Sequence, residues 1–204
     1  MKITEILKRR GNIREVRFDD GTYILLDKRL FEEAALKEGD EISEEKADFL
    51  EDTSDELRCK NRAMYYLSGA DYSVSALKKK LFTAGFCEPY VSKTVARLSE
   101  LKLLDDTRYC KRFVEYSREQ NLSEREIKEK AKLKGIPYDI IKEVLEENEQ
   151  DEVQRIVNLL CKKYLNKLED EADAEKVIAS LARKGFKFSD IRSALRLIEF
   201  GETE

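Results

Sequence analysis

The sequence lacks histidine altogether, and this absence limits the chemistry that the chain can perform. Without an imidazole there is no His-dependent nucleophilic catalysis, and the usual Cys/His zinc sites are not expected. The cysteines carry no Cys-x-x-Cys pair and are scattered through the chain, at Cys59, Cys87, Cys110 and Cys161. This spacing predicts reduced thiols on the apolar faces of helices in a cytoplasmic protein. We therefore expect no metal, no cofactor and no catalytic residue.

Proline and glycine are also scarce, with two prolines and eight glycines among 204 residues, so long irregular regions are not expected. No signal peptide and no apolar run of membrane-spanning length is present, which predicts neither secretion nor membrane insertion. Hydrophobic residues make up 41% of the chain and charged residues 40%. That balance, rich in Lys, Glu, Leu, Ala and Arg, favours thin layers of helices over a thick globule.

The net charge of −4 is unevenly distributed. Residues 1–57 carry a net charge of −7, whereas residues 58–104 carry nine basic and three acidic residues, a net charge of +6. Residues 105–148 and 149–204 are nearly balanced, at −1 and −2. A dedicated DNA-coating protein is usually basic throughout. This distribution instead favours local contact with phosphate beside contact with a protein.

The first 42 residues have the alternation of a small β-rich unit. Residues 13–18 alternate apolar and polar side chains, Asp19-Asp20-Gly21 is a hairpin turn signal, and residues 22–26 form the return strand. Weaker signals predict a first strand over 3–7, a short helix over 29–36 and a last strand edge at 41–42. A folding cap or an interaction tag is the expected role of this unit.

A helical linker is predicted over residues 43–57, where Ser43 is the N-terminal signal of a helix. Thr53-Ser54-Asp55 predicts a break in this helix, with Ser54 or Asp55 capping the next one. Only helices are expected from Asp55 onward.

The rest of the chain contains a repeat of 50 residues, marked by Gly85, Gly135 and Gly185. Twelve residues before each glycine stands a capping residue, namely Ser73, Ser123 and Asp173. An apolar residue follows each glycine directly, and further apolar residues recur at the same distances in all three copies. Each glycine is predicted to stop a helix, because a left-handed conformation costs little only without a β-carbon.

Another helix is predicted before each capping residue, at about residues 57–67, 106–120 and 151–167. The chain is thus predicted to be mainly α, with three tandem three-helix repeats in an elongated array after the β-rich unit. The repeats are assigned to residues 58–104, 105–148 and 149–204. Modules of this size bury little surface alone, so stacking is expected to complete their cores.

The start of the second repeat, residues 103–119, has the most informative local pattern. Asp105 and Asp106 suit the N-terminus of a helix, where they cap free N–H groups and oppose the helix dipole. An apolar stripe at helical spacing follows, formed by Tyr109, Cys110, Phe113, Val114 and Tyr116. The other face is basic and carries Arg108, Lys111, Arg112 and Arg118.

The segment from Leu104 to Arg118 resembles the RecX family, bacterial regulators of the recombinase RecA. The family pattern there is roughly Leu-Asp-Asp-x-Arg-aromatic-Ala-x-x-Phe-Val-x-x-Arg, with Cys110 in place of the alanine. The tandem three-helix repeats over about residues 58–200 extend the resemblance. Two departures are Lys102, where the family usually has glycine, and Gln120-Asn121, where glycine and basic residues are usual.

The resemblance implies a non-enzymatic, cytoplasmic regulator, mainly an inhibitor, that binds the RecA–DNA filament. Such a protein limits filament growth, ATP hydrolysis, strand exchange and coprotease activity, in the setting of DNA repair, recombination and the SOS response. A monomer is expected, with weak contact to single- or double-stranded DNA. Two alternatives are a helical DNA-binding module that acts without RecA and a tandem scaffold like ubiquitin-associated domains.

The basic residues are the candidate contacts for RecA or DNA, and a solvated helix surface is the alternative interpretation for each cluster. Tyr65, Tyr66 and Tyr72 are further candidates, for stacking on bases, although such aromatics are more often core residues. The candidate contacts are Lys78, Lys79, Arg97, Arg108, Lys111, Arg112, Arg118, Lys134, Arg183 and Lys184.

Overall fold

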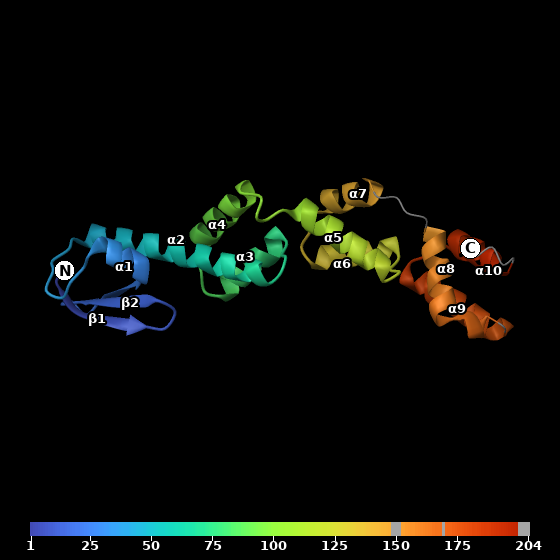
Figure 1. Cartoon of the computed structure of the whole chain (residues 1–204), viewed down its shortest axis with the longest axis horizontal. Coiled ribbons are helices and arrows are strands. Elements are labelled where there is room, and N and C mark those ends of the chain that lie inside the picture. Colours follow the sequence, from blue (N-terminus) through green and yellow to red (C-terminus); the bar gives the residue numbers. More distant parts are fainter. Residues whose placement is uncertain (148–151, 169, 200–204) are drawn as a thin grey trace. The chain divides into compact units, whose positions relative to one another are not determined.

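The computed structural model describes residues 1–147, 152–168 and 170–199. The predicted fold class is confirmed, since the described chain is mainly helical with a small sheet at its N-terminus (Figure 1). No helix within these residues has both the length and the apolarity to cross a membrane.

The N-terminal unit contains an antiparallel sheet of β1 (Ile3–Arg9), β2 (Ile13–Phe18) and β3 (Tyr23–Asp27), in that order. The turn at Gly21, with φ +84°, connects β2 to β3 as the hairpin signal predicts. The helix α1 (Lys28–Ala34) follows, and an isolated bridge between Lys2 and Glu41 closes the edge. The predicted strands, short helix and strand edge are therefore confirmed.

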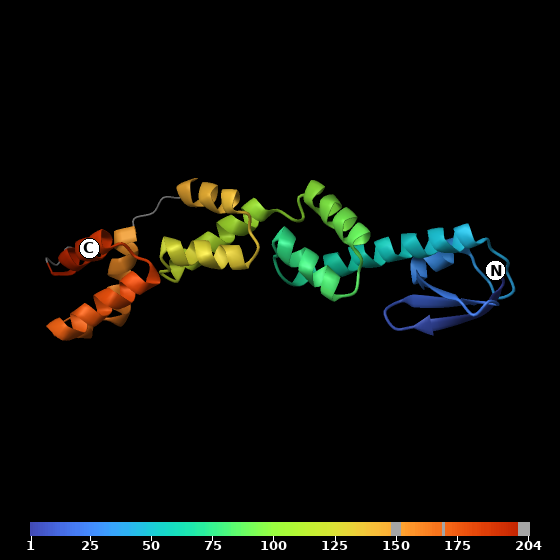
Figure 2. The same ribbon diagram turned by 180° about the vertical axis from the view of Figure 1, so that it is seen from behind.

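The helix α2 (Glu44–Gly69) packs against β3 and is continuous, so the predicted break at Thr53-Ser54-Asp55 is wrong (Figures 1 and 2). These polar side chains find partners that do not interrupt the helix. The hydroxyl of Thr53 donates to the Phe49 carbonyl at 2.7 Å, and Ser54, fully buried, accepts from the backbone N–H of Asp27 at 2.7 Å. The latter bond attaches the end of the sheet to the middle of α2.

The remaining described elements follow the repeat. The first repeat comprises the C-terminal part of α2 with α3 (Val74–Thr83) and α4 (Glu88–Glu100). The second comprises α5 (Asp106–Glu119), α6 (Glu124–Leu133) and α7 (Tyr138–Glu147). The third comprises α8 (Glu152–Lys163), a 3₁₀ turn (Leu165–Lys167), α9 (Glu171–Lys184) and α10 (Phe188–Glu199). In each repeat the first helix packs against the third.

The predicted glycine stops are confirmed, because Gly85, Gly135 and Gly185 follow α3, α6 and α9 with φ of +91°, +74° and +99°. One predicted cap is wrong: Asp170, not Asp173, caps α9, and its carboxylate accepts from the Asp173 backbone N–H at 3.0 Å. The helix α9 therefore starts earlier than its counterparts and has 14 residues where α6 has 10. The predicted start of the preceding helix at residue 151 lies outside the described residues.

Two of the four cysteines depart from the prediction of buried thiols. Cys59 and Cys110 are buried, and burial raises the pKa of the Cys110 thiol to about 11. Cys87 and Cys161 are exposed. Cys87 precedes the first turn of α4 at the N-cap position, where its side chain makes no capping hydrogen bond.

The chain divides into two compact units. The first contains residues 1–71 and 77–104, and the second contains residues 72–76 together with the chain from Asp105 onward. The first turn of α3 thus belongs to the same unit as the second and third repeats. The contacts that place it there form part of the candidate site.

Candidate functional site

The N-terminal serines of α3 and α6 each make the same pair of hydrogen bonds, and both are fully buried. Ser123 accepts from the backbone N–H of Glu126 at 3.1 Å, while its hydroxyl donates to the carbonyl of Lys184 at 2.5 Å. Ser73 likewise accepts from Ala76 at 3.1 Å and donates to the carbonyl of Lys134 at 2.5 Å. Each serine therefore caps its own helix and the end of the corresponding helix one repeat later.

We refer to these contacts between consecutive repeats as junctions. At each junction an acidic residue from the start of the next repeat accepts a further hydrogen bond. The Asp106 carboxylate accepts from the backbone N–H of Val74 at 2.8 Å, and the Glu152 carboxylate accepts from that of Glu124 at 3.0 Å. Burial raises the pKa of the Asp106 carboxyl above its ordinary value, although the bond from Val74 opposes this shift. Asp105 caps α5 as predicted, accepting from Arg108 N–H at 2.9 Å.

The glycines complete the junctions because they permit close approach of the preceding repeat. A β-carbon at Gly135 would lie 2.6 Å from the Cβ of Ser75, and one at Gly185 would lie 2.8 Å from the Cβ of Arg125. At Gly85 no atom of the described residues lies within 4 Å of that position. Gly135 and Gly185 thus serve the turn and the junction, whereas Gly85 serves the turn alone.

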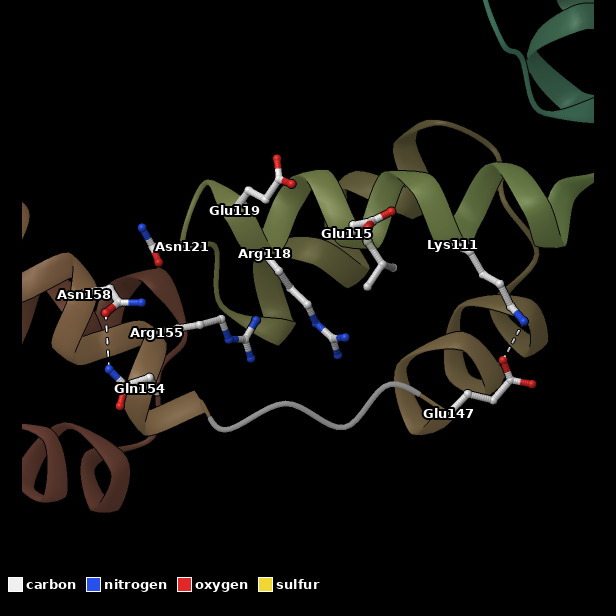
Figure 3. Close-up of a pocket in the computed structure, with 10 residues that line it drawn as sticks. Lys111, Glu115, Arg118, Glu119, Asn121, Glu147, Gln154, Arg155 and Asn158 are labelled. Atoms are coloured by element: carbon white, nitrogen blue, oxygen red, sulfur yellow. Dashed lines mark hydrogen bonds and ion pairs between the residues drawn. The ribbon is translucent and has the colours of Figure 1, made fainter. Parts of the chain in front are cut away.

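An open cavity of about 1080 Å³ lies between α5 and α8, beside the junction that contains Ser123 and Glu152 (Figure 3). Cationic, anionic and amide side chains all contribute to its walls. The charged lining residues are Lys111, Arg118, Arg155, Glu115, Glu119 and Glu147, and the amides are Asn121, Gln154 and Asn158. Lys111 and Glu147 form an ion pair at 2.8 Å across one end of the cavity.

Two arginines from different repeats enter this cavity. Arg155, only 7% exposed, donates to the Leu122 carbonyl at 3.0 Å and lies 3.4 Å from the Glu152 carboxylate. Arg118 is half-buried, and burial together with the nearby charge of Arg155 lowers its pKa. The Nε–H groups of both arginines are buried without an acceptor among the described residues.

The structure distributes the predicted contact residues of the second unit over several surfaces. Lys111 and Arg118 line the cavity, whereas Arg108 and Arg112 are exposed on α5 and do not line it. Lys134 ends α6, and its ammonium group lies 5.4 Å from the centre of the Phe113 ring. Arg183 and Lys184 end α9, where their charge complements the helix dipole.

In the first unit, Lys78 is half-buried and Lys79 is exposed, both on α3. Arg97 on α4 pairs with Glu100 at 2.9 Å, with both side chains largely exposed. Tyr65 is 69% exposed, while Tyr66 lies under the ammonium group of Lys80 at 4.9 Å.

Sequence reasoning missed Arg155. The residue interrupts a run of apolar positions in α8, standing directly before Ile156 and four before Leu159, both of which are buried. A lone arginine on the apolar face of an amphipathic helix is the signal that would have identified a buried cation, since arginine is almost never fully buried unless paired.

Comparison with known proteins identifies relatives with this architecture. Residues 59–98 match the model of the first three-helix domain of RecX, and residues 149–195 match that of the third. The regulatory protein RecX of Streptococcus pneumoniae (strain Hungary19A-6) is 30% identical over 196 residues, covering 95% of this chain and 76% of that protein. That of Caldanaerobacter subterraneus is 29% identical over 203 residues, covering 97% and 100%. A crystal structure of regulatory protein RecX shares the fold, with a TM-score of 0.70 at 21% identity, covering 96% of this chain and 98% of that one.

Proposed function

The chain belongs to the RecX family of regulatory proteins, and from this premise we propose that it binds RecA on DNA and limits filament growth. The observation that carries the proposal is the full-length relationship to RecX proteins, which includes the repeats and the N-terminal unit. Inhibition of RecA ATPase, strand exchange and coprotease activity follows from competitive binding. It requires no catalytic residue, metal or cofactor, and the protein acts in the cytoplasm as a monomer.

The exposed cations of α5 are the proposed contacts with RecA. Arg108 and Arg112 lie four residues apart, so they are neighbours on the helix surface, where two like charges repel each other. An acidic protein surface complements such a pair of exposed cations. The helix end cations Lys134, Arg183 and Lys184 are proposed to extend the same kind of contact.

The cations of the first repeat are the proposed contacts with DNA. Residues 58–104 carry a net charge of +6, and the exposed Lys79 and Arg97 with the half-buried Lys78 contribute to it. Such contact is weak, because a chain with a net charge of −4 is repelled by phosphate elsewhere. We therefore assign DNA a supporting role and RecA the main one.

The test measures RecA ATPase on single-stranded DNA while this protein is titrated from substoichiometric ratios upward. Inhibition is expected, and its absence at a molar excess would contradict the proposal. Arg108→Ala with Arg112→Ala should weaken inhibition more than DNA binding. Lys78→Ala, Lys79→Ala and Arg97→Ala together should instead flatten the salt dependence of oligonucleotide binding, whose slope is about −0.7 per phosphate contacted.

Residues 58–104, with their net charge of +6, also support a second candidate function, that of a DNA-binding module independent of RecA. The two functions predict opposite results for the double variant of α5 and the triple variant of the first repeat. If the triple variant abolishes inhibition of RecA while the α5 pair leaves it unchanged, DNA binding is the primary activity. Fluorescence anisotropy on a labelled oligonucleotide, measured over a salt series, supplies the second readout.

A further inference from the structure

The cavity between α5 and α8 contains two positive charges whose hydrogen-bonding capacity the described residues do not satisfy. The Nε–H of Arg118 and the Nε–H of Arg155 are both buried without an acceptor. Figure 3 shows both side chains directed into the space between the helices. Leaving a buried charged donor unpaired is costly, so a group that accepts from both arginines would stabilise this arrangement.

Bound water alone does not supply a charged acceptor for these arginines. A water molecule accepts a hydrogen bond from either guanidinium, but it carries no negative charge. The Glu152 carboxylate forms an ion pair with Arg155 at 3.4 Å and already accepts from the backbone N–H of Glu124 at 3.0 Å, and the charge of Glu124 also acts on Arg155. Lys111 and Glu147 neutralise each other at the far end of the cavity.

We propose that the arginine end of this cavity binds a single oxyanion of the phosphate class, held between Arg118 of α5 and Arg155 of α8. The planar guanidinium group offers paired donors that match phosphate oxygens, and both arginines line the cavity. Asn121, Gln154 and Asn158 also line the cavity and supply neutral amide donors. No catalytic step is involved.

The rest of the lining limits which phosphates can enter. Glu115, Glu119 and Glu147 share the walls, and their charges oppose a nucleic-acid backbone with its closely spaced phosphates. An isolated phosphate brings fewer negative charges close to these carboxylates than a nucleic-acid backbone does. The volume of about 1080 Å³ exceeds that of one phosphate group, so a phosphate monoester also fits. The site is therefore distinct from the proposed DNA contacts of the first repeat, and it does not depend on RecA binding.

Binding at this site links two repeats. Arg118 belongs to α5 of the second repeat and Arg155 to α8 of the third. One ligand therefore contacts both repeats within the same compact unit. Because the ligand binds the folded arrangement and not the unfolded chain, it should stabilise the fold by mass action. Phosphate should accordingly raise the melting temperature of the full-length protein.

The experiment titrates the full-length protein with inorganic phosphate and follows the arginine Nε–Hε signals by ¹H–¹⁵N NMR. Sodium chloride at matched ionic strength is the reference. We expect the Arg118 and Arg155 signals to shift and saturate with phosphate but not with chloride. Arg118→Gln should weaken phosphate binding by about tenfold or more, since a hydrogen bond to a charged group is lost. A nucleoside monophosphate arm distinguishes a phosphate ester from free phosphate as the preferred ligand.

Arg108→Gln is the matched control, because Arg108 lies on the same helix, is exposed and does not line the cavity. Equal weakening by both variants, or shifts that never saturate, would overturn the proposal. Should Arg118→Gln fail to fold, Arg118→Lys keeps the charge but loses the planar fork, and it should still weaken binding. An oligonucleotide that competes as well as phosphate at the same phosphate concentration would also overturn the assignment.

A final variant tests whether the chain supplies its own anion. Glu149 and Asp151 precede α8 in the sequence and lie outside the described residues. Unchanged phosphate affinity in the Glu149→Gln, Asp151→Asn variant supports a site for an external oxyanion. A gain of about tenfold or more would show that a carboxylate of the chain itself competes for the arginines, and the proposal would fail.

Discussion

Gly85 and Gly135 end equivalent helices of consecutive repeats, yet they meet very different surroundings. Both have left-handed φ, +91° and +74°, so both avoid the steric cost of a β-carbon in that conformation. Of these two glycines, Gly135 alone is approached within contact distance by another part of the described chain, the side chain of Ser75. Repeated positions in a sequence therefore share a local role, while an additional role depends on whether another residue, such as Ser75, approaches the position closely.

Substitution of these glycines by alanine should produce the largest difference between the two positions. Gly85→Ala is expected to cost about 1–2 kcal/mol from the strained φ alone. Gly135→Ala adds a clash with the Ser75 side chain and should cost about 2–4 kcal/mol in total. Urea unfolding followed by circular dichroism measures both free energies of unfolding.

A second change isolates the clash from the strain. Adding Ser75→Gly to Gly135→Ala removes the β-carbon that the new methyl group meets, and should recover much of the excess cost. The same Ser75→Gly change paired with Gly85→Ala should recover nothing. Equal costs for Gly85→Ala and Gly135→Ala would show that the close approach at the junction is energetically unimportant.

The buried serines give the next largest effect. Ser73→Ala removes both the cap of α3 and the hydrogen bond to the Lys134 carbonyl, and should cost about 1–3 kcal/mol. Ser43 caps α2 by accepting from the Lys46 N–H, and it is the matched control. Ser43→Ala should cost only about 0.5–1 kcal/mol in the same unfolding assay. A larger loss at Ser43 than at Ser73 would contradict the double role of Ser73.

Substitution of Asp106 should have a smaller effect on stability, and this effect should depend on pH. Its pKa in the folded protein is raised by burial, so the folded state binds the proton more tightly than the unfolded state, whose pKa is near 3.8. The stability of the parent relative to Asp106→Asn should therefore rise as pH falls through the raised folded pKa toward 3.8. The asparagine oxygen can still accept from the Val74 N–H, so the bond itself is retained.

Unfolding of parent and variant in parallel between pH 7 and pH 4 measures this difference and cancels the titration of all other groups. A difference that stays constant across the range would mean that Asp106 titrates alike in the two states. A relative stability of the parent that falls with decreasing pH would indicate a lowered pKa, contrary to the burial of this carboxyl.

Local features of this fold could be predicted from sequence, whereas contacts between distant residues could not. The glycine stops, the Ser123 cap and the β-hairpin each depend on a few neighbouring residues, and all were correctly predicted. The continuity of α2 was mispredicted because Ser54 bonds to Asp27, 27 residues away. The junction bonds from Ser73 and Ser123 each span 61 residues, so the repeat revealed the serines but not their partners.

Two positions where this chain departs from the family pattern give the smallest predicted effect. Lys102 and Asn121 both adopt left-handed φ of +54°, and they lie at the two departures from the expected RecX pattern in the sequence. Asparagine tolerates this conformation better than lysine does, because its short polar side chain can bond locally. Lys102→Gly should therefore stabilise the protein by about 0.5–1 kcal/mol, and Asn121→Gly by less than about 0.5 kcal/mol. Lys102→Ala is the control in the same urea assay, because it removes the charge but keeps the β-carbon. It should give no gain, and a gain equal to that of Lys102→Gly would assign the effect to charge and not to backbone strain.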